Sequence, residues 1–550
     1  MKKLLSILTL FIATVTYSQN TVGTLLNTTE TVNGYTLFSP RTTITPRYTY
    51  LLDNCGEIVN QWESTFPLFS TDYLMPDGSL YRSVIDNQST LDIPGNTGRI
   101  EHLDWEGNLI WGLTYSDTDF SFHHDYQILP NGNILLLVAK RKTLGESLAA
   151  GRNPTTIANN ELYEESVIEI IPQGSDQFTI VWEWNSWDHL IQDFDDTKDN
   201  FGNVGAHPEK VDINYGTNFG EADWWHANAL SYSPELDQII ISNRNLDEFI
   251  IIDHSTTTAE AATGSGGNSG MGGDIIYRWG NPESYRQGTA ADKKLFAQHD
   301  VHFIPEGLPD AGKIMIFNNG DDVAFTAIQI IEPPYNASTQ NYDYTGGAYL
   351  PENPTSQYVD PDNPQEFFAA FLSGAQQLSN GNILICNGPA GFLFEVTPDN
   401  ETVWEYQSPV ASSGILSDGD NPGASQTRVF RALRYEPNYP AFTGRDLTPQ
   451  GPIELNPVAD ACEVLDINSF TENKQISLYP TLTTNVVNVL IDSNQRFKAT
   501  VFSIQGQELL SLENQTQINI ENFPNGVYLI KIDVFTDNKS KGQVFKIIKQ

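Results

Sequence analysis

The sequence predicts an all-β protein, a six-bladed β-propeller followed by a small C-terminal β-sandwich. Short apolar strands are separated by Gly, Asn, Asp and Pro turns, and two strand patterns recur along most of the chain. The repeats are irregularly spaced, roughly 50 to 100 residues apart, which is typical of propeller blades with insertions. A chain of 550 residues that is 39% hydrophobic and 11% aromatic can bury the core that such a fold needs.

The N-terminal residues 1–18 are predicted to be a secretory signal peptide. Lys2 and Lys3 precede an apolar run from Leu4 to Val15, and small residues follow before Gln19. The run is too short for a membrane anchor, and no later segment is long and apolar enough to cross a bilayer. The mature protein is therefore expected beyond the inner membrane, without a transmembrane span.

Two strand patterns define the predicted propeller domain, residues 19–465. One is a Pro-Asn-Gly type of turn that enters an apolar strand, and the other is an apolar strand, a polar turn and a Trp-centred strand. Each pair of patterns supplies about four strands, and five pairs are visible. The turn pattern occurs at residues 74–81, 128–137 and 377–386, with looser copies at 232–242 and 304–317.

A sixth blade is expected to close the ring. Residues 428–435 contribute a strand to it together with N-terminal residues, although the irregular spacing leaves seven blades open. Three long insertions are expected to be loops on one face, where binding loops collect: residues 188–221, 257–273 and 335–365.

The last residues, 466–550, form short alternating strands and are predicted to be a small β-sandwich. Three segments, SLYP at 477–480, NGVYLIKI at 525–532 and the terminal KIIKQ, resemble the C-terminal sorting domain of type IX secretion. The resemblance implies that the type IX secretion machinery is a partner. It also implies export across the outer membrane, with the protein secreted or at the cell surface and the sorting domain either cleaved off or attached there.

The chain contains three cysteines, too few for a disulfide scaffold or a Cys-rich zinc site. Cys55 lies in the first repeat and Cys462 just after the last one. Export makes a disulfide between these two chemically possible. Cys386 stands in an apolar run and is expected to be a buried free thiol.

The charge balance excludes two classes of partner. The formal net charge is -39, whereas binding to nucleic acid or to an anionic membrane needs a basic surface. An anionic substrate would need a local basic pocket. The acid-rich turn at residues 195–200 lacks the spacing of a calcium loop.

Alignment of the turn repeats places four polar side chains at matched positions. His124 and His299 stand six residues before the turn proline, Ser373 stands six before the serine that replaces it, and His226 stands eight before Pro234. The innermost strands of a propeller surround one axis, so these side chains are expected to meet at one mouth of the channel. The alternative is that each histidine satisfies a local hydrogen bond, which is less favoured for three of nine histidines in register.

A second group of residues suits the binding of an oxyanion. His226 and Asn228 are two apart on one strand and share a face, and Arg244 ends the next apolar strand. The forked guanidinium of arginine makes paired hydrogen bonds to oxyanions. A salt bridge in this acidic protein is an equally good explanation of Arg244.

These residues, in this order and spacing, resemble the arylsulfate sulfotransferases over roughly residues 40 to 450. The motifs are HHD with His124, WWHAN with His226 and Asn228, SNRN with Arg244, and QHD with His299, followed by NNG, Ser373 and ICNG. The resemblance implies a nucleotide-independent enzyme, with no cofactor and no metal. It would transfer a sulfuryl group from an aryl sulfate donor to a phenolic acceptor in ping-pong order.

The resemblance also assigns roles to the residues. His299 is the nucleophile that becomes a sulfohistidine, and the sulfuryl oxygens would be held by His124, His226, Arg244 and Asn228. Ser373 is a substrate contact at a position where the family often has threonine. His123 and His302 are expected to be structural.

Two other classes of function stay open. Three converging histidines also suit zinc, although a fixed cation at Arg244 would repel a metal ion. A non-catalytic exported propeller could instead bind a carbohydrate or a protein. No Gly-rich phosphate loop opens a helix, so no nucleotide donor is expected.

Overall fold

The computed structural model describes residues 20–216, 221–361, 363–365, 367–457, 462, 476–480, 482–491, 496–503, 507–536 and 539–549. The chain divides into two compact units, Met1–Glu463 and Val464–Gln550, which we describe separately. The predicted signal peptide and the predicted domain boundary at residues 465 and 466 lie outside the described residues. No helix in the described part of the chain is long and apolar enough to cross a membrane.

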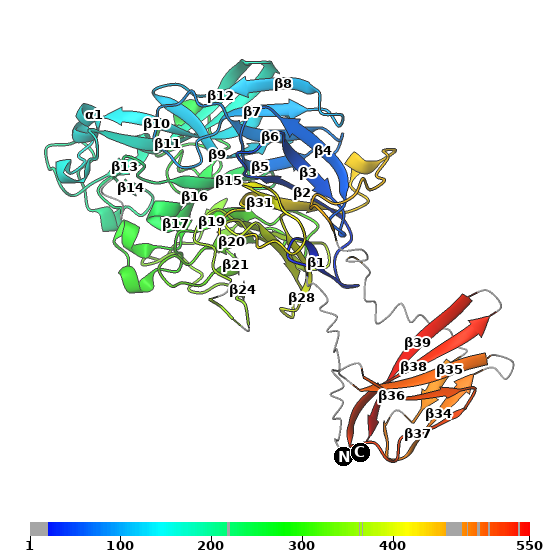
Figure 1. The fold of residues 1–550 in the computed structure, drawn as a ribbon. Coiled ribbons are helices and arrows are strands. Elements are labelled where there is room, and N and C mark those ends of the chain that lie inside the picture. The colour runs from blue at the N-terminus through cyan, green and yellow to red at the C-terminus, as the bar shows by residue number, and fades with distance from the viewer. Residues whose placement is uncertain are drawn as a thin grey trace, which may run out of the picture. The chain divides into compact units, whose positions relative to one another are not determined.

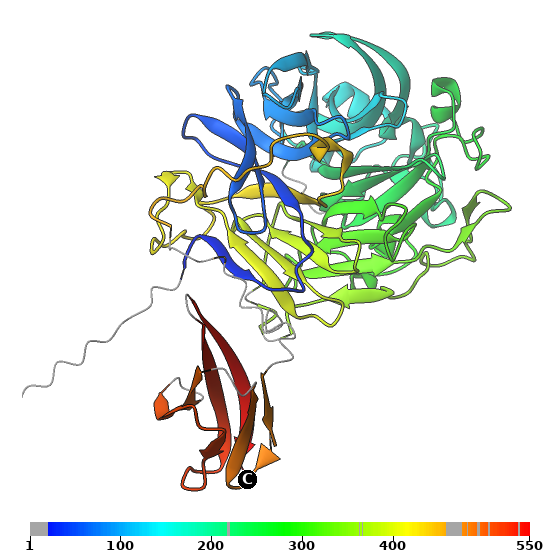
Figure 2. The same cartoon turned by 90° about the vertical axis from the view of Figure 1, so that its right-hand side faces the viewer.

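The first unit is a β-propeller (Figures 1 and 2). Within residues 20–457, six antiparallel sheets have four or five strands each. In chain order of their innermost strands, and from the inside outward, the sheets are β5(Leu68–Leu74), β6(Leu80–Ile85), β7(Gly98–Leu103) and β8(Leu109–Thr114); β9(Phe120–Ile128), β10(Ile134–Thr143), β11(Glu161–Gly174) and β12(Gln177–Asn185); β15(Ala227–Ser233), β16(Gln238–Asn243), β17(Glu248–Asp253) and β18(Tyr277–Trp279); β19(His299–Phe303), β20(Ile314–Asn318), β21(Ala327–Ile331) and β24(Ser356–Tyr358); β25(Gly374–Gln377), β26(Ile383–Asn387), β27(Phe392–Val396), β28(Thr402–Gln407) and β1(Gly23–Asn27); and β31(Val429–Tyr435), β2(Tyr35–Pro40), β3(Arg47–Leu52) and β4(Ile58–Ser64).

The innermost strands follow one another around a ring. Strand β5 contacts β9, β9 contacts β15, β15 contacts β19, β19 contacts β25, β25 contacts β31, and β31 contacts β5 again. These strands lie toward the middle of the unit in Figure 1. The prediction of an all-β propeller is confirmed. The described residues contain six such sheets, and the number of blades stays a prediction.

The ring closes by pairing the two ends of the domain. Strand β31, the segment predicted to do so, pairs with the N-terminal strand β2, with Leu37 opposite Leu433. Strand β1 adds a fifth strand to the sheet of β28. The disulfide that was chemically possible is present between Cys55 and Cys462, and Cys386 is a buried free thiol.

Apolar runs form the middle strands of the blades because both faces of these strands are covered. All six residues of β16 and of β17 are buried, whereas the outer strand β12 is exposed at four of its first five positions. Asn-Gly turns connect such strands. Glycine is needed there because Gly132 and Gly381 have φ values of +86° and +91°, a region that favours glycine.

The innermost strands are irregular at the level of the predicted site. Register shifts occur in β5, β9, β15 and β19, and between β31 and β2. At these places His124, His226 and Asp300 adopt positive φ values of 52°, 50° and 49°. A bulge inserts a residue and re-aims its neighbours' side chains, so these irregularities decide which side chains face the ring's axis.

The three insertions contain short elements. Residues 335–365 are more than a loop, because they supply β24, the outermost strand of the β19 sheet. The remaining elements of the first unit are α1(Leu144–Ala149), η1(Pro154–Thr156), η2(Ser186–His189), β13(Leu190–Ile191), η3(Val204–Ala206), β14(Val211–Asp212), η4(Arg244–Leu246), α2(Thr258–Ala261), η5(Pro282–Tyr285), η6(Ala290–Asp292), β22(Tyr335–Asn336), β23(Asn341–Tyr342), β29(Val410–Ala411), β30(Gly414–Ile415) and η7(Pro440–Phe442).

The second unit has two sheets around one apolar core, as predicted for a β-sandwich. Its core includes Val487, Phe497, Val501, Ile518 and Ile530. One sheet contains β32(Ile476–Tyr479), β34(Val486–Ile491) and β37(Gln517–Asn519), and the other contains β33(Leu482–Thr483), β39(Lys539–Lys549), β38(Gly526–Thr536), β35(Arg496–Ser503) and β36(Glu508–Glu513).

Candidate functional site

Three histidines from three different sheets meet near the axis of the ring. His124 is on β9, His226 directly precedes β15, and His299 begins β19. The ring centroids of His124 and His226 are 4.8 Å apart, in an edge-to-face arrangement. Burial lowers the pKa of His124 well below its usual value, and the nearby His226, His123, His299 and Arg244 lower it further. The structure therefore brings together the histidines that the repeat alignment selected.

His299 is held in one orientation by Asn319, which directly follows β20. Its Nδ1 atom lies 2.8 Å from Asn319 Oδ1 and 3.1 Å from the carbonyl oxygen of Ala297. Asn319 Nδ2 donates to the carbonyl oxygens of Ala369, at 2.6 Å, and Leu372, at 3.1 Å. These bonds fix which end of the amide faces the histidine. Nδ1 must then donate its proton, so Nε2 keeps a free lone pair.

The charge state of His299 follows from its surroundings. Burial lowers the pKa of this imidazole well below its usual value, and the positive charge of Arg244 lowers it further. Hydrogen bonds from Nδ1 to Asn319 and Ala297 oppose that shift without reversing it. His299 is therefore neutral near pH 7, the form in which Nε2 can act as a nucleophile.

His226 forms a pair with a buried carboxylate. Its Nδ1 atom lies 2.5 Å from Asp223 Oδ2, so Nδ1 carries the proton and Nε2 is directed elsewhere. Asp223 is 2% exposed and His226 is 7% exposed. A carboxylate in this position orients the ring and stabilises an added proton on Nε2.

His124 is oriented by a chain of two buried groups. Glu165 Oε2 lies 2.9 Å from Nε2 of His123, and Nδ1 of His123 lies 2.9 Å from Nδ1 of His124. Since the carboxylate accepts a proton from His123 Nε2, a neutral His123 must accept from His124 Nδ1. The remaining nitrogen of His124, Nε2, is then unprotonated. His123 thus contributes by positioning its neighbour.

Arg244 is the accessible cation of this group. Its side chain is 25% exposed, its Nη1 donates to Asn245 Oδ1 at 3.1 Å, and Nη2 lies 3.9 Å from Asp321. The nearest carboxylate is thus at the outer limit of an ion pair, and this side chain keeps donors for an incoming anion.

The side chains of Asn228 and Ser373 form hydrogen bonds to backbone groups around the site. Asn228 is buried, and its Nδ2 donates to the carbonyl oxygen of Gln298, the residue before His299. The Ser373 hydroxyl accepts from the backbone N–H of Gly388 at 2.9 Å and donates to the carbonyl oxygen of Phe371 at 3.3 Å. Both side chains anchor the backbone around the histidines, and their contact with a substrate stays a prediction.

Three residues of the site were not selected by the sequence. Asn319 lies in the NNG motif that the sequence analysis noted, but no function was assigned to it there. Asp223 precedes His226 by three residues, a spacing that could have identified it. Glu165 had no local signal, because it comes from β11, two strands outward in the sheet of His124.

A layer of buried charges lies directly beyond the histidines along the innermost strands. Arg431 Nη1 lies 3.1 Å from Asp125 Oδ2, and Arg431 Nε lies 3.0 Å from Asp300 Oδ1. The two carboxylates also accept backbone N–H groups, from Leu230 at 3.1 Å and from Ala375 at 2.9 Å. The layer thereby links β9, β15, β19, β25 and β31.

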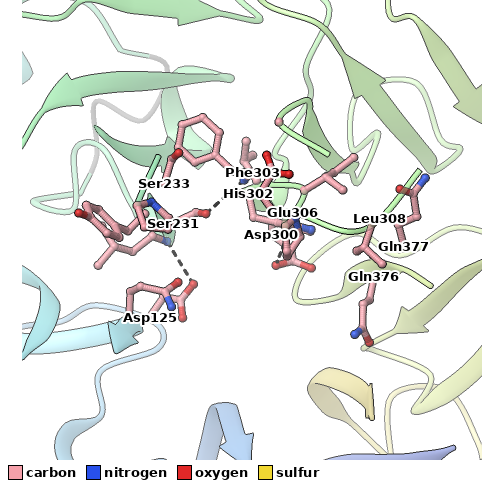
Figure 3. A pocket seen from close by; sticks show the side chains of 18 of the residues that line it. Asp125, Ser231, Ser233, Asp300, His302, Phe303, Glu306, Leu308, Gln376 and Gln377 are labelled. Carbon is pink, nitrogen blue, oxygen red and sulfur yellow. Dashed lines mark hydrogen bonds and ion pairs between the residues drawn. The ribbon is translucent and has the colours of Figure 1, made fainter. Parts of the chain in front are cut away.

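A cavity of about 610 Å³ lies on the far side of this layer. Figure 3 shows Asp125, Ser231, Asp300, His302 and Gln376 around it, and none of the three site histidines lines it. His302 Nδ1 lies 2.9 Å from the carbonyl oxygen of Asp300. Burial alone would lower the pKa of His302, but the Asp300 carboxylate raises it above its usual value. His302 thus belongs to the cavity and not to the histidine site.

Among the residues that the structure describes, no group of three or more His, Cys, Asp or Glu side chains is arranged to hold a metal ion. Each of the three site histidines has one ring nitrogen within hydrogen-bond distance of a protein group, and the positive charge of Arg244 acts on His124 and His299.

Residues 21–413 match the family model described as Arylsulfotransferase (ASST). The chain belongs to the arylsulfotransferase family. Membership supports an aryl sulfate sulfotransferase that acts on small molecules. Residues 477–550 match the secretion system C-terminal sorting domain. This domain indicates that the arylsulfotransferase is exported by type IX secretion and is secreted or at the cell surface.

Several solved structures resemble this chain distantly. No curated protein matches the chain. A protein of unknown function from Bacteroides caccae is 9% identical, with a TM-score of 0.38, and the match covers 73% of this chain and 98% of that one. The periplasmic gluconolactonase of Pseudomonas aeruginosa is 11% identical, with a TM-score of 0.35 and coverages of 73% and 99%. Virginiamycin B lyase from Staphylococcus aureus is 11% identical, with a TM-score of 0.32 and coverages of 70% and 88%.

Proposed function

We propose that this arylsulfotransferase transfers a sulfuryl group from an aryl sulfate to a phenol through a sulfohistidine at His299, in ping-pong order and without a nucleotide or metal. One observation carries the proposal. The Nδ1 proton of His299 is held by Asn319, which leaves Nε2 unprotonated on a neutral ring beside Arg244 and two further histidines.

In the first half-reaction, the Nε2 lone pair of His299 forms a bond to the sulfur of the donor. The bond between sulfur and the aryl oxygen breaks, and its electron pair leaves on the phenolate oxygen. The imidazole ring gains positive charge as the N–S bond forms. The Nδ1–H bonds to Asn319 and Ala297 stabilise that charge.

The second half-reaction reverses these bonds with a new phenol. The acceptor's oxygen bonds to sulfur, the N–S bond breaks, and the electron pair returns to His299 Nε2. His226 is suited to move the proton, because Asp223 stabilises a protonated ring. Its unprotonated Nε2 would take the proton of the acceptor phenol as the new O–S bond forms, and the first product leaves as a phenolate that takes its proton from solvent.

The sulfuryl oxygens carry the charge that must be stabilised in a loose transition state. Arg244 is suited to bind them because its guanidinium keeps free donors. Asn228 is the other proposed donor, with Ser373 beside it as a contact of the substrate, and His124 would donate to a sulfuryl oxygen only when its Nε2 has taken up a proton. Removal of one such donor typically costs about 2.7–4 kcal/mol of barrier.

Incubation of the purified protein with 4-nitrophenyl sulfate tests the proposal. We expect sustained release of nitrophenolate when phenol is present, together with formation of phenyl sulfate. Without phenol, release should stop after about one equivalent per enzyme, since the sulfohistidine waits for an acceptor. Equal, sustained release without phenol would identify water as the acceptor and a sulfatase, and no release at all would contradict both.

Arg244 should also set the lower pH limit of the first half-reaction. Burial lowers the pKa of His299 and the Arg244 charge lowers it further, so the wild-type nucleophile stays neutral well below the usual histidine range. In Arg244→Gln that repulsion is absent, the pKa rises, and the ring is protonated at a higher pH. We expect the acid limb of the single-turnover rate to move to higher pH in R244Q, on top of a slower maximal rate. An acid limb at the same pH in both proteins would contradict this electrostatic role.

A further inference from the structure

An aromatic cluster adjoins His124. The Phe69 ring centroid lies 6.4 Å from that of His124, and the Phe430 centroid lies 6.3 Å from it. Phe69 and Phe430 are 5.4 Å apart and pack with Leu372 and with the partly buried Phe371. These side chains come from β5, from β31 and from the segment before β25, so the cluster lies at the histidine end of the innermost strands.

Two arginines stand over this cluster. The Arg41 guanidinium carbon lies 4.5 Å from the Phe69 ring centroid, and that of Arg428 lies 5.3 Å from the Phe371 centroid. The backbone N–H of Arg41 donates to the carbonyl oxygen of Arg428 at 2.7 Å. The pairing of β2 with β31, which closes the ring, therefore continues to this point and holds the two arginines side by side.

The charges of these two arginines are not balanced by nearby carboxylates. The chain has 69 acidic residues and 30 basic ones, yet among the described residues no carboxylate forms an ion pair with Arg41 or Arg428. Arg428 Nε donates instead to the carbonyl oxygen of Ser425, at 3.0 Å. Arg41 is exposed and Arg428 is partly exposed. Two like charges are thus kept together and open to solvent in a protein with a net charge of -39.

The two arginine charges repel each other. Surrounding protein lowers the pKa of Arg41, and the charge of Arg428 lowers it further. Placing two guanidinium groups next to each other costs free energy unless an anion binds between them. The pair of Arg41 and Arg428 therefore indicates a binding site for an anionic ligand rather than a structural ion pair.

We propose that Phe69, Phe430 and Phe371, with Arg41 and Arg428, form a subsite for an aromatic substrate that carries a second anionic group, a carboxylate, at the end remote from the transferred sulfuryl group. The proposal rests on the proposed sulfuryl transfer. The Phe69 ring lies between His124 and Arg41: its centroid is 6.4 Å from the His124 centroid and 4.5 Å from the Arg41 guanidinium carbon. A para-substituted phenol that lies along the edge of this cluster would place its hydroxyl toward His124 and present its carboxylate to both guanidinium groups.

The test compares two acceptors that differ in charge, with 4-nitrophenyl sulfate as the constant donor. The anionic acceptor is 4-hydroxybenzoate, and the neutral acceptor is its counterpart 4-cresol. In the double variant R41Q/R428Q we expect the KM for the anionic acceptor to rise about tenfold or more, since charge-assisted hydrogen bonds are lost. The KM for the neutral acceptor, and the kcat with either acceptor, should change less than about twofold, because uniform binding is removed and not the chemistry.

Two further variants serve as controls. Arg445→Gln removes one positive charge from a residue that stacks on Trp105, at 4.9 Å, and should alter the KM for neither acceptor. Arg41→Lys keeps the charge and should retain part of the preference for the anionic acceptor. The same comparison with 4-sulfooxybenzoate as the donor shows whether the subsite serves the donor as well.

The outcomes separate the two proposals. Absence of transfer to any acceptor by the wild-type protein would overturn the proposed function. Transfer by R41Q/R428Q in which KM changes equally for the anionic and the neutral acceptor, in a variant with wild-type thermal unfolding, would overturn the subsite alone.

Discussion

Replacement of His299 by alanine is expected to abolish sulfuryl transfer, with a loss of kcat on the order of 10⁴-fold or more. The loss is this large because Nε2 forms the covalent bond in both half-reactions, and Asn319 fixes the Nδ1 proton that leaves this nitrogen free. The measurement is nitrophenolate release with phenol present. Mass analysis should find one sulfuryl group on the His299 peptide of the wild-type protein after treatment with an aryl sulfate, and none in H299A.

A matched control comes from the same strand. His302 is also on β19 but lines the cavity beyond the Arg431 layer, and His302→Gln should keep most of the activity. Asn319→Leu should lie between the two, because it leaves the nucleophile in place but removes the acceptor that fixes its tautomer. Full activity in H299A, or a sulfuryl group found on His124 or His226 instead, would contradict the assignment of the nucleophile.

The convergence of the three histidines could be predicted because equivalent positions in the blades of a propeller lie close together around its central axis. His124 and His299 share their distance from the turn proline, and the structure brings both to the site. His226 stands at a different distance and still arrives there. The spacing between site and turn varies from blade to blade, and the register shifts in β9, β15 and β19 are not marked by any residue type in the sequence.

The direction of each polar side chain could not be predicted. The sequence predicted Asn228 from the strand face that it shares with His226, and Ser373 from its position in the repeat. In the structure both side chains hold backbone groups, at Gln298 and at Gly388. Asn319 and Asp223 fix the tautomers of His299 and His226, which depends on the precise placement of hydrogen-bonding atoms. Such contacts arise from the packing of neighbouring sheets and leave no pattern along one strand.

The ring closure could be predicted in outline. Residues 428–435 have the length and apolar content of a strand but no neighbouring repeat to pair with, which left the N-terminal segment as the partner that β2 proves to be. The outer strand β24 was missed, because it is three residues long and lies inside an insertion rich in turn residues. Strand β24 forms because it pairs with β21, and not because its own residues favour a strand.

Replacement of Arg431 by methionine is expected to destabilise the propeller by about 3–5 kcal/mol at pH 7, because two buried carboxylates would lose their shared cation. Asp125 is 1% exposed and Asp300 is 5% exposed, so water reaches little of either carboxylate even though both line the cavity. Burial raises the pKa of Asp125 even in the presence of Arg431, while the Arg431 charge holds the pKa of Asp300 below its usual value despite burial. Unfolding in urea, followed by tryptophan fluorescence, measures the loss.

The pH dependence of this loss has a definite sign. Without Arg431 the folded-state pKa values of Asp125 and Asp300 both rise above those of the unfolded chain. The folded variant then binds protons more readily than the unfolded one, so the penalty is present above the raised pKa values and is relieved as the pH falls through them. The difference between wild type and R431M should therefore shrink between pH 7 and pH 5, whereas Arg431→Lys, which keeps the charge, should show a smaller and less pH-dependent loss. An R431M protein as stable as wild type at pH 7 would show that the five strands joined by this layer do not depend on it, and that the layer serves the cavity or the histidine site instead.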